Sequence, residues 1–266
     1  MPRIAASNPN YSFVLRNDNT GRYLSKCTIE LPSVTTVIKR VLAKTALVPW
    51  TYRQTLDAFV GVIGMVEDGS LAIEDLIDTF SDVDMAAEWM KENALRPEDF
   101  ANDAAKRGRG THDFLERLAK IGIEDDEAAE AYAKKHVDGD DPFVHGVCQW
   151  WLDRNPSAVA AEEVVWSTRL GVAGSIDLVW IDRNLAVITD LKTRKAGSST
   201  YDTDFVQVDG YMSLWNERHP EKQGNVGSVL YVCDDGTYSE TDVPANFARS
   251  FDKVKELHDM LRGKEV

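Results

Sequence analysis

The spacing of apolar and polar positions predicts helices over most of the first hundred residues. Ser33 suits the N-cap of the first helix, because its hydroxyl can accept a hydrogen bond from a free N–H of the first turn. Pro49 suits the first turn of the second helix, which should run to about Val66. Ser70 and Asp82 are N-cap candidates for two further helices.

Strand patterns lie mostly in the second half of the chain, but residues 11–15 and 22–24 flank a turn-rich segment and predict a small hairpin. Stretches rich in Val, Ile and Leu predict strands at residues 158–167, 174–181, 185–191 and 226–232. Asp182-Arg183-Asn184 predicts a three-residue hairpin turn between the second and the third. Helical spacing occupies residues 97–118, 124–135, 143–152, 205–216 and 244–261. This order predicts an α/β or α+β core.

The predicted hairpin carries charges among apolar neighbours. Asp190 and Lys192 are two residues apart on one strand and therefore share a face, and Asp177 should lie opposite Thr189 or Asp190. Two carboxylates about 4 Å apart repel by roughly 4 kcal/mol at an effective dielectric constant near 20. A divalent cation such as Mg²⁺ or Mn²⁺ would offset this repulsion, and a structural ion pair with Lys192 is the alternative.

Gly174-x-x-Asp177 followed by Asp190-x-Lys192 resembles the catalytic core of the PD-(D/E)XK nucleases. Gly110-Thr111-His112 resembles the motif that precedes this core in the RecB-type branch, and Gln207-x-x-x-Tyr211 resembles the motif on the helix after the catalytic strand. Glu162 or Glu163 matches an acidic residue that often precedes the first core Asp, and the spacing to Val165 favours Glu162. These elements occur in the order of the family.

The resemblance implies a restriction-endonuclease-like core, in which helices flank a central mixed sheet. We expect the core at residues 96–266 and a mainly helical N-terminal region at residues 1–95. The implied catalytic residues are Asp177, Asp190, Lys192 and Glu162. The implied metal ligands are His112, Asp177, Asp190 and the backbone carbonyl of Leu191. The implied substrate contacts are Gln207, Tyr211, Arg109, Thr193 and Arg194.

The net charge of −14 argues against DNA binding through the overall field of the protein. The charges are segregated, however, with twelve acidic and two basic residues between Glu67 and Asp103. Basic residues cluster instead at Lys106, Arg107 and Arg109 and again at Lys192, Arg194 and Lys195. We therefore expect DNA to be held locally, along basic side chains beside the hairpin.

Three cysteines without a CxxC pair predict no iron–sulfur cluster, a departure from the similar CRISPR-associated RecB-type exonucleases. No apolar run approaches the roughly 20 residues that span a bilayer, and the N-terminus, Met1-Pro2-Arg3-Ile4, lacks the long apolar stretch of a signal peptide. We expect a cytoplasmic protein without a membrane partner, located in the host cytoplasm if it is encoded by a phage.

The function that the resemblance implies is Mg²⁺- or Mn²⁺-dependent hydrolysis of DNA. The expected mode is exonucleolytic, on linear double-stranded or single-stranded DNA, in phage replication or recombination. Two alternatives stay open: a structure-selective endonuclease, and a nuclease-fold binding module whose acidic helices dock a phage or host recombination protein.

Overall fold

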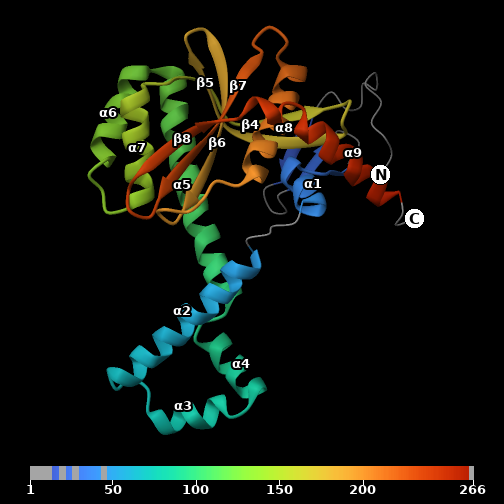
Figure 1. Cartoon of the computed structure of the whole chain (residues 1–266). Helices are drawn as coiled ribbons and strands as arrows, with labels where there is room; N and C mark the ends of the chain where they lie inside the picture. Colours follow the sequence, from blue (N-terminus) through green and yellow to red (C-terminus); the bar gives the residue numbers. More distant parts are fainter. Residues whose placement is uncertain (1–13, 18–21, 26–29, 43–46, 264–266) are drawn as a thin grey trace. The chain divides into compact units, whose positions relative to one another are not determined.

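The computed structural model describes residues 14–17, 22–25, 30–42 and 47–263 (Figure 1). The chain forms two compact units. The first consists of Met1–Ala43 with Gly110–Val266, and the second is Lys44–Arg109. The predicted domain boundary between residues 95 and 96 stays a prediction.

A five-stranded mixed sheet forms the centre of the first unit. Its strands follow the order β4 (Ser157–Ser167), β5 (Val172–Asp182), β6 (Leu185–Arg194), β7 (Gly224–Cys233) and β8 (Tyr238–Asp242). Only β6 and β7 pair in parallel, and α8 (Asp202–Arg218) provides the crossover that a parallel pair requires. The four predicted strands and the mixed sheet are confirmed. The strand β8 was not predicted, because its residues Tyr-Ser-Glu-Thr-Asp are mostly polar.

Helices cover both faces of this sheet (Figure 1). On one face, α5 (Pro97–Glu124), α6 (Asp126–His136) and α7 (Pro142–Arg154) form a core with Leu178, Trp180 and Leu191. On the other, α1 (Val34–Val41), α8 and α9 (Ser250–Arg262) form a core with Ile176, Val179 and Ile188.

The turn between β5 and β6 is shorter than predicted. Asp182 pairs with Leu185, so the loop contains only Arg183 and Asn184. Both have positive φ, 47° and 71°, as expected for the two-residue turns that match the twist of a hairpin. The three-residue turn was therefore wrong by one residue. The pairing ends at Leu178 with Thr189, so Thr189 is not the partner of Asp177, and a position of Asp177 opposite Asp190 stays a prediction.

The N-terminal part of the first unit contains a small sheet of β1 (Val14–Asn17), β2 (Arg22–Ser25) and β3 (Glu30–Leu31). The antiparallel pairing of β1 with β2 confirms the predicted hairpin, although residues 11–13 lie outside the described residues. The Ser33 hydroxyl accepts a hydrogen bond from the N–H of Thr36 at 3.0 Å, which confirms Ser33 as the N-cap of α1.

The second unit contains α2 (Leu47–Glu67), α3 (Ile73–Phe80), α4 (Val83–Glu92) and the start of α5. Asp82 accepts hydrogen bonds from two N–H groups of α4, as an N-cap should. The prediction for Ser70 was wrong, because α3 begins only after Ala72 and the Ser70 hydroxyl donates back to the carbonyl of Met65.

The end of the chain is also less regular than predicted. A short 3₁₀ helix, η2 (Ala245–Phe247), precedes α9 in place of one continuous helix. The Asp209 carboxylate of α8 accepts hydrogen bonds from the N–H groups of Arg249 and Phe251, each at 2.9 Å. These bonds give unpaired N–H groups at the start of α9 an acceptor on a distant helix. The spacing of apolar residues within α9 cannot reveal such a partner. Among the described residues, none of the helices has the length and apolar character needed to cross a bilayer.

Candidate active site

Asp177 and Asp190 lie on neighbouring strands at the point where the pairing of β5 with β6 ends. Both are buried, with 8% and 2% of their surface exposed. The last paired residues are Leu178 and Thr189. Beyond them, the N–H of Leu191 donates to Oδ2 of Asp177 at 2.7 Å instead of to the neighbouring backbone. A buried N–H needs such a partner, so the bond fixes the Asp177 carboxylate against β6.

Asp190 and Lys192 form an ion pair on the face of the sheet that α8 covers. Nζ of Lys192 lies 2.6 Å from Oδ2 of Asp190. The Gln207 side chain bridges them: its Nε2 donates to Oδ1 of Asp190 at 2.7 Å, and its Oε1 accepts from Nζ of Lys192 at 3.3 Å. Nε2 of Gln207 also donates to the hydroxyl of Tyr211 at 3.0 Å. The structure thus brings these four predicted residues together.

The pKa values of the site residues are shifted because the two carboxylates are buried and close to charged groups. Burial raises the pKa of Asp190 to about 6, with Lys192 opposing the rise and Asp177 adding to it. Burial acts on Asp177 in the same direction, but the charges of His112 and Lys192 outweigh it and lower the pKa of Asp177. Burial would lower the pKa of His112, yet the neighbouring Asp177 raises it to about 9. Positive charge on the protein therefore balances the carboxylates here.

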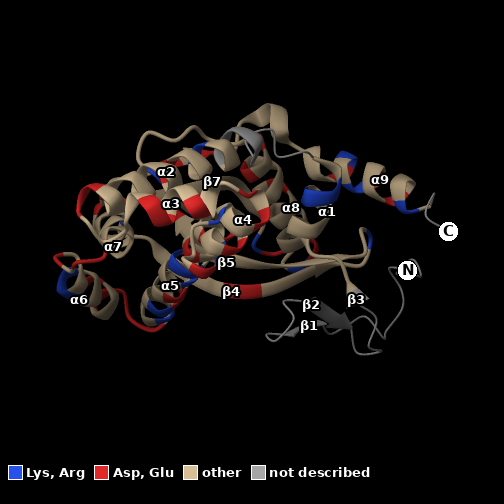
Figure 2. Ribbon diagram, turned by 90° about the horizontal axis from the view of Figure 1, so that it is seen from below, with Lys and Arg blue, Asp and Glu red and all other residues tan. Residues whose placement is uncertain are grey.

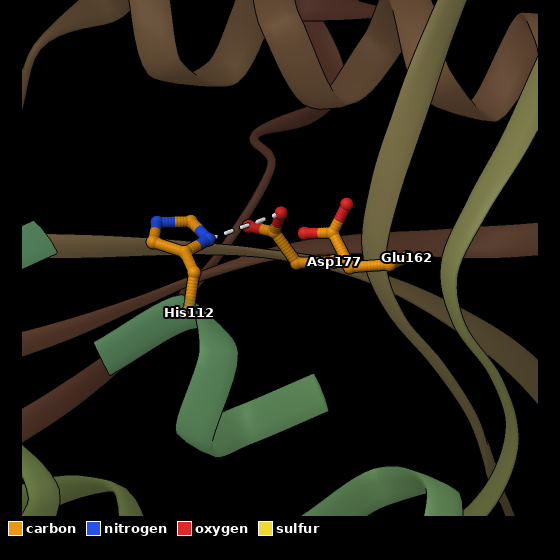
Figure 3. Close-up of side chains that lie close together, drawn as sticks. All are labelled: His112, Glu162 and Asp177. Carbon is orange, nitrogen blue, oxygen red and sulfur yellow. Dashed lines mark ion pairs between the residues drawn. The ribbon is translucent and has the colours of Figure 1, made fainter. Parts of the chain in front are cut away.

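His112, Glu162 and Asp177 form a cluster from three different elements, α5, β4 and β5 (Figure 3). Nδ1 of His112 lies 3.2 Å from Oδ1 of Asp177. One ligand atom of each residue lies within 4.8 Å of the others. Nearby, Oδ2 of Asp190 is buried without a hydrogen-bond partner among the described residues, although the Lys192 ammonium is close enough for ionic attraction. This set of oxygen and imidazole donors fits a divalent cation.

Glu162, and not Glu163, is directed toward the site. Its backbone has a φ of 48°, a conformation that non-glycine residues rarely adopt. The neighbours Ala161 and Glu163 still pair with β5, at Leu178 and Ile176. Glu163 forms an ion pair with His219 at 3.0 Å instead. Such backbone outliers concentrate at functional sites, where the surrounding structure holds them in place.

The family model described as "PD-(D/E)XK nuclease superfamily" matches residues 86–264. The chain belongs to this superfamily. A search of curated proteins gave no match. A solved structure described as "Crystal structure of SSO0001" is 16% identical, with 57% of this chain and 74% of that chain covered and a TM-score of 0.31.

The superfamily of the chain connects the cluster of His112, Glu162 and Asp177 with metal-ion chemistry. PD-(D/E)XK nucleases use divalent metal ions, usually Mg²⁺ or Mn²⁺, and membership implies DNA as the substrate. The mixed sheet with helices on both faces agrees with the restriction-endonuclease-like fold of the superfamily.

Gly174, the glycine of the Gly174-x-x-Asp177 motif, has a packing reason in this PD-(D/E)XK protein. A Cβ atom at this position would lie 2.6 Å from Cε1 of Tyr211. The buried Tyr211 ring therefore rests directly on the backbone of β5. This close approach places the Tyr211 hydroxyl beside Gln207.

We predict that Gly174→Ala displaces the Tyr211 ring and lowers the free energy of unfolding by about 1–3 kcal/mol, as overpacking usually does. Chemical denaturation measures this change, and DNA hydrolysis should fall with it. Gly64→Ala is the control, because nothing lies within 4 Å of its Cβ position. A Gly174→Ala variant with unchanged stability and rate would contradict the packing argument.

Other predicted site residues are placed differently. Leu191 lies between Asp190 and Lys192, and its side chain packs in the core beneath α5–α7. Thr193 is the next residue of β6, so its side chain lies on the face opposite Lys192. Arg109 belongs to the second unit. The Arg194 guanidinium is held by protein groups, as described below.

The structure adds one residue beside the site that the sequence analysis did not single out. The Ser175 hydroxyl donates to Oε2 of Glu162 at 2.7 Å and so supports its unusual backbone conformation. Ser175 stands inside the Gly174-x-x-Asp177 motif, which is the signal that could have identified it. Glu116, one turn after His112 on α5, forms an ion pair with Lys120 at 2.5 Å.

Proposed function

We propose that this protein is a Mg²⁺- or Mn²⁺-dependent deoxyribonuclease of the RecB-type branch that degrades linear DNA from its ends. The observation that carries the proposal is the cluster of His112, Glu162 and Asp177 beside the Asp190–Lys192 ion pair. A role in phage replication or recombination belongs to the same proposal, supported by the sequence resemblance.

Asp177, Asp190 and His112 would hold the metal ion, with the Leu191 carbonyl as a further ligand. Glu162 would complete the site, since its carboxylate lies near His112 and Asp177. When bound, a divalent cation polarises a phosphate and lowers the pKa of water. His112 would release its proton on binding the ion, because only the neutral ring has a free lone pair.

Lys192 would stabilise the negative charge that develops on the phosphate during hydrolysis. Gln207 keeps this ammonium beside Asp190, because its amide contacts both groups. Tyr211 accepts a hydrogen bond from the same amide and would line the substrate side with it. Arg109 and Thr193 are proposed substrate contacts. Hydrolysis then joins a water oxygen to phosphorus, and the departing sugar oxygen leaves with a proton.

The RecB-type assignment is supported by motif order. His112 on α5 precedes the core strands, while Gln207 and Tyr211 lie on α8, directly after the catalytic strand β6. The proposal includes no iron–sulfur cluster, because three cysteines cannot supply the usual four ligands. Acidic residues occur in both α3 and α4, and those of α3 are marked in Figure 2, which agrees with local rather than global attraction of DNA.

The test compares degradation of linear and closed circular DNA in Mg²⁺, Mn²⁺ or EDTA. We expect metal-dependent loss of linear DNA and persistence of circles. Degradation of closed circles would favour the alternative of a structure-selective endonuclease. Activity that persists in EDTA would overturn the metal mechanism, and an inert protein with every metal and substrate would favour a binding module.

Two adjacent glutamates provide a matched test of the metal ligands. We predict that Glu162→Gln weakens Mn²⁺ binding by about 10- to 100-fold, the range seen when groups that support a metal site are removed. Glu163→Gln is the control, because Glu163 pairs with His219. Isothermal titration with Mn²⁺ measures both affinities. Equal affinities in the two variants would remove Glu162 from the proposed site.

The helical second unit supports an additional role, the binding of a phage or host recombination protein. Tyr52, Leu56, Val60 and Ile63 recur at helical spacing on α2 and are 45–68% exposed. Between Glu67 and Asp103 acidic residues outnumber basic ones twelve to two. A partner segment with apolar and basic residues would complement this surface. Val60→Glu with Ile63→Glu should abolish co-purification with such a partner and leave DNA hydrolysis intact.

A further inference from the structure

Arg194, the last residue of β6, is surrounded by protein groups. Its Nη2 lies 2.9 Å from Oδ2 of Asp204, and its Nη1 donates to the carbonyl of Ser199 at 2.7 Å. The guanidinium stacks 3.5 Å from the ring centre of Tyr231, and the Tyr231 hydroxyl donates to Asp204 at 3.3 Å. Only 9% of the Arg194 side chain is exposed. Its donors and its planar face are thus directed at the protein.

This network lies directly beside the site. Arg194 follows Lys192 by two residues on β6, so both side chains point toward α8. Asp204 precedes Gln207 by three residues on α8, so these two share one helix face. The strand and helix are therefore joined by two successive contacts, Lys192 with Gln207 and Arg194 with Asp204.

We propose that Arg194 and Asp204 are positioning residues. They fix the first turn of α8 against β6 and thereby determine the position of the Gln207 amide. The inference rests on the proposed function, in which Gln207 orders Lys192 and Asp190. It replaces phosphate binding as the role of Arg194.

The chemistry of the arginine supports this role. A guanidinium can donate to a carbonyl and a carboxylate at once while its face stacks on an aromatic ring. A lysine at this position has a compact ammonium, which cannot make these two hydrogen bonds and stack a planar face on the ring at the same time. Asp204 is itself buried, so the loss of its charge would leave a buried guanidinium without its ionic partner.

Without Asp204 to hold it, the first turn of α8 would shift relative to β6 and carry the Gln207 amide away from Asp190. Displacements of about 1 Å at a reacting centre can lower rates by about 100-fold. The rate of the chemical step should respond, while DNA binding should not, because neither residue contacts DNA in this proposal.

The test is a double-mutant cycle on kcat with Asp204→Asn, Gln207→Ala and the double variant. We expect Asp204→Asn to lower kcat by about 10- to 100-fold with KM changed less than about twofold. In the Gln207→Ala background, Asp204→Asn should have almost no further effect, because coupled residues are not additive. Arg194→Lys should behave like Asp204→Asn, and Asp202→Asn, an exposed carboxylate on the same helix, should behave like wild type.

If Asp204→Asn lowers kcat by the same factor in the wild-type and the Gln207→Ala backgrounds, the inference is overturned. A rise in KM that steepens with salt after Arg194→Lys, the behaviour of a phosphate contact, would overturn it. A Gln207→Ala variant with full activity would also overturn it.

A second measurement is independent of catalysis. In ¹H–¹⁵N spectra, the Gln207 side-chain amide signals, identified by their absence in Gln207→Ala, should shift in Asp204→Asn and stay in place in Asp202→Asn. Unshifted signals in a folded Asp204→Asn protein would contradict the positioning role even if the wild type has no nuclease activity. An inactive wild type with shifted signals would instead overturn only the proposed function.

Discussion

Asp190→Asn is expected to lower the rate of DNA hydrolysis by at least about 1,000-fold, equivalent to about 4 kcal/mol of activation free energy. Asp190 is the most buried carboxylate of the site, and its Oδ2, which lies 2.6 Å from the Lys192 ammonium, makes no hydrogen bond among the described residues, so this oxygen would also be available to a metal ion. The amide of Asn keeps the shape of the side chain and removes the negative charge. Initial rates on labelled linear DNA measure the effect.

Asp182→Asn is the matched control, because Asp182 lies at the far end of the same hairpin and its side chain is 47% exposed. Its rate should equal that of the wild type. An Asp190→Asn variant that retains more than a tenth of the wild-type rate would remove Asp190 from the mechanism.

Lys192→Met is expected to lower the rate by about 100- to 1,000-fold, the usual loss when one group that stabilises developing charge is removed. The ammonium lies 2.6 Å from Asp190 and is the closest cationic group to that carboxylate. Lys195→Met, at an exposed position in the next loop, should retain the wild-type rate. Full activity of Lys192→Met would show that the metal site alone supports hydrolysis.

The same variant should also change the pH dependence of stability in EDTA. The pKa of Asp190 is about 6 in the folded protein, above its ordinary value, so the folded state binds a proton more tightly than the unfolded state. Stability is then fully present at low pH and falls as the pH rises through the folded pKa. Lys192 opposes this rise in pKa, so Lys192→Met should lose more stability between pH 5 and about 8 than the wild type does. Chemical denaturation at these pH values measures the difference.

Much of this site could be predicted from the sequence because it depends on short-range rules. Strand alternation places Asp190 and Lys192 on one face, and the hairpin brings the Asp177 carboxylate to the N–H of Leu191 on the neighbouring strand. Motif spacing identifies His112, Gln207 and Tyr211, which the fold then brings together with them. Each of these steps uses residues that are close in the chain or in a fixed motif order.

The parts that could not be predicted depend on backbone detail or on distant partners. The choice between Glu162 and Glu163 rests on a left-handed backbone at Glu162 and on the bond from Ser175. The loop of the hairpin is two residues long because Asn184 and Arg183 both adopt positive φ. Arg194 stands in a basic segment that suggested phosphate contact, yet its nearest groups come from α8 and β7.

The most direct test of the central claim, a metal-dependent nuclease centred on this hairpin, is to locate the ion. Crystals grown with Mn²⁺ can be measured at a wavelength where manganese scatters anomalously. We expect a strong peak bounded by His112, Asp177 and Asp190, and we expect Asp190→Asn to weaken or abolish it. If the protein degrades DNA in Mn²⁺ but its crystals show manganese peaks only away from these residues, the central claim is contradicted.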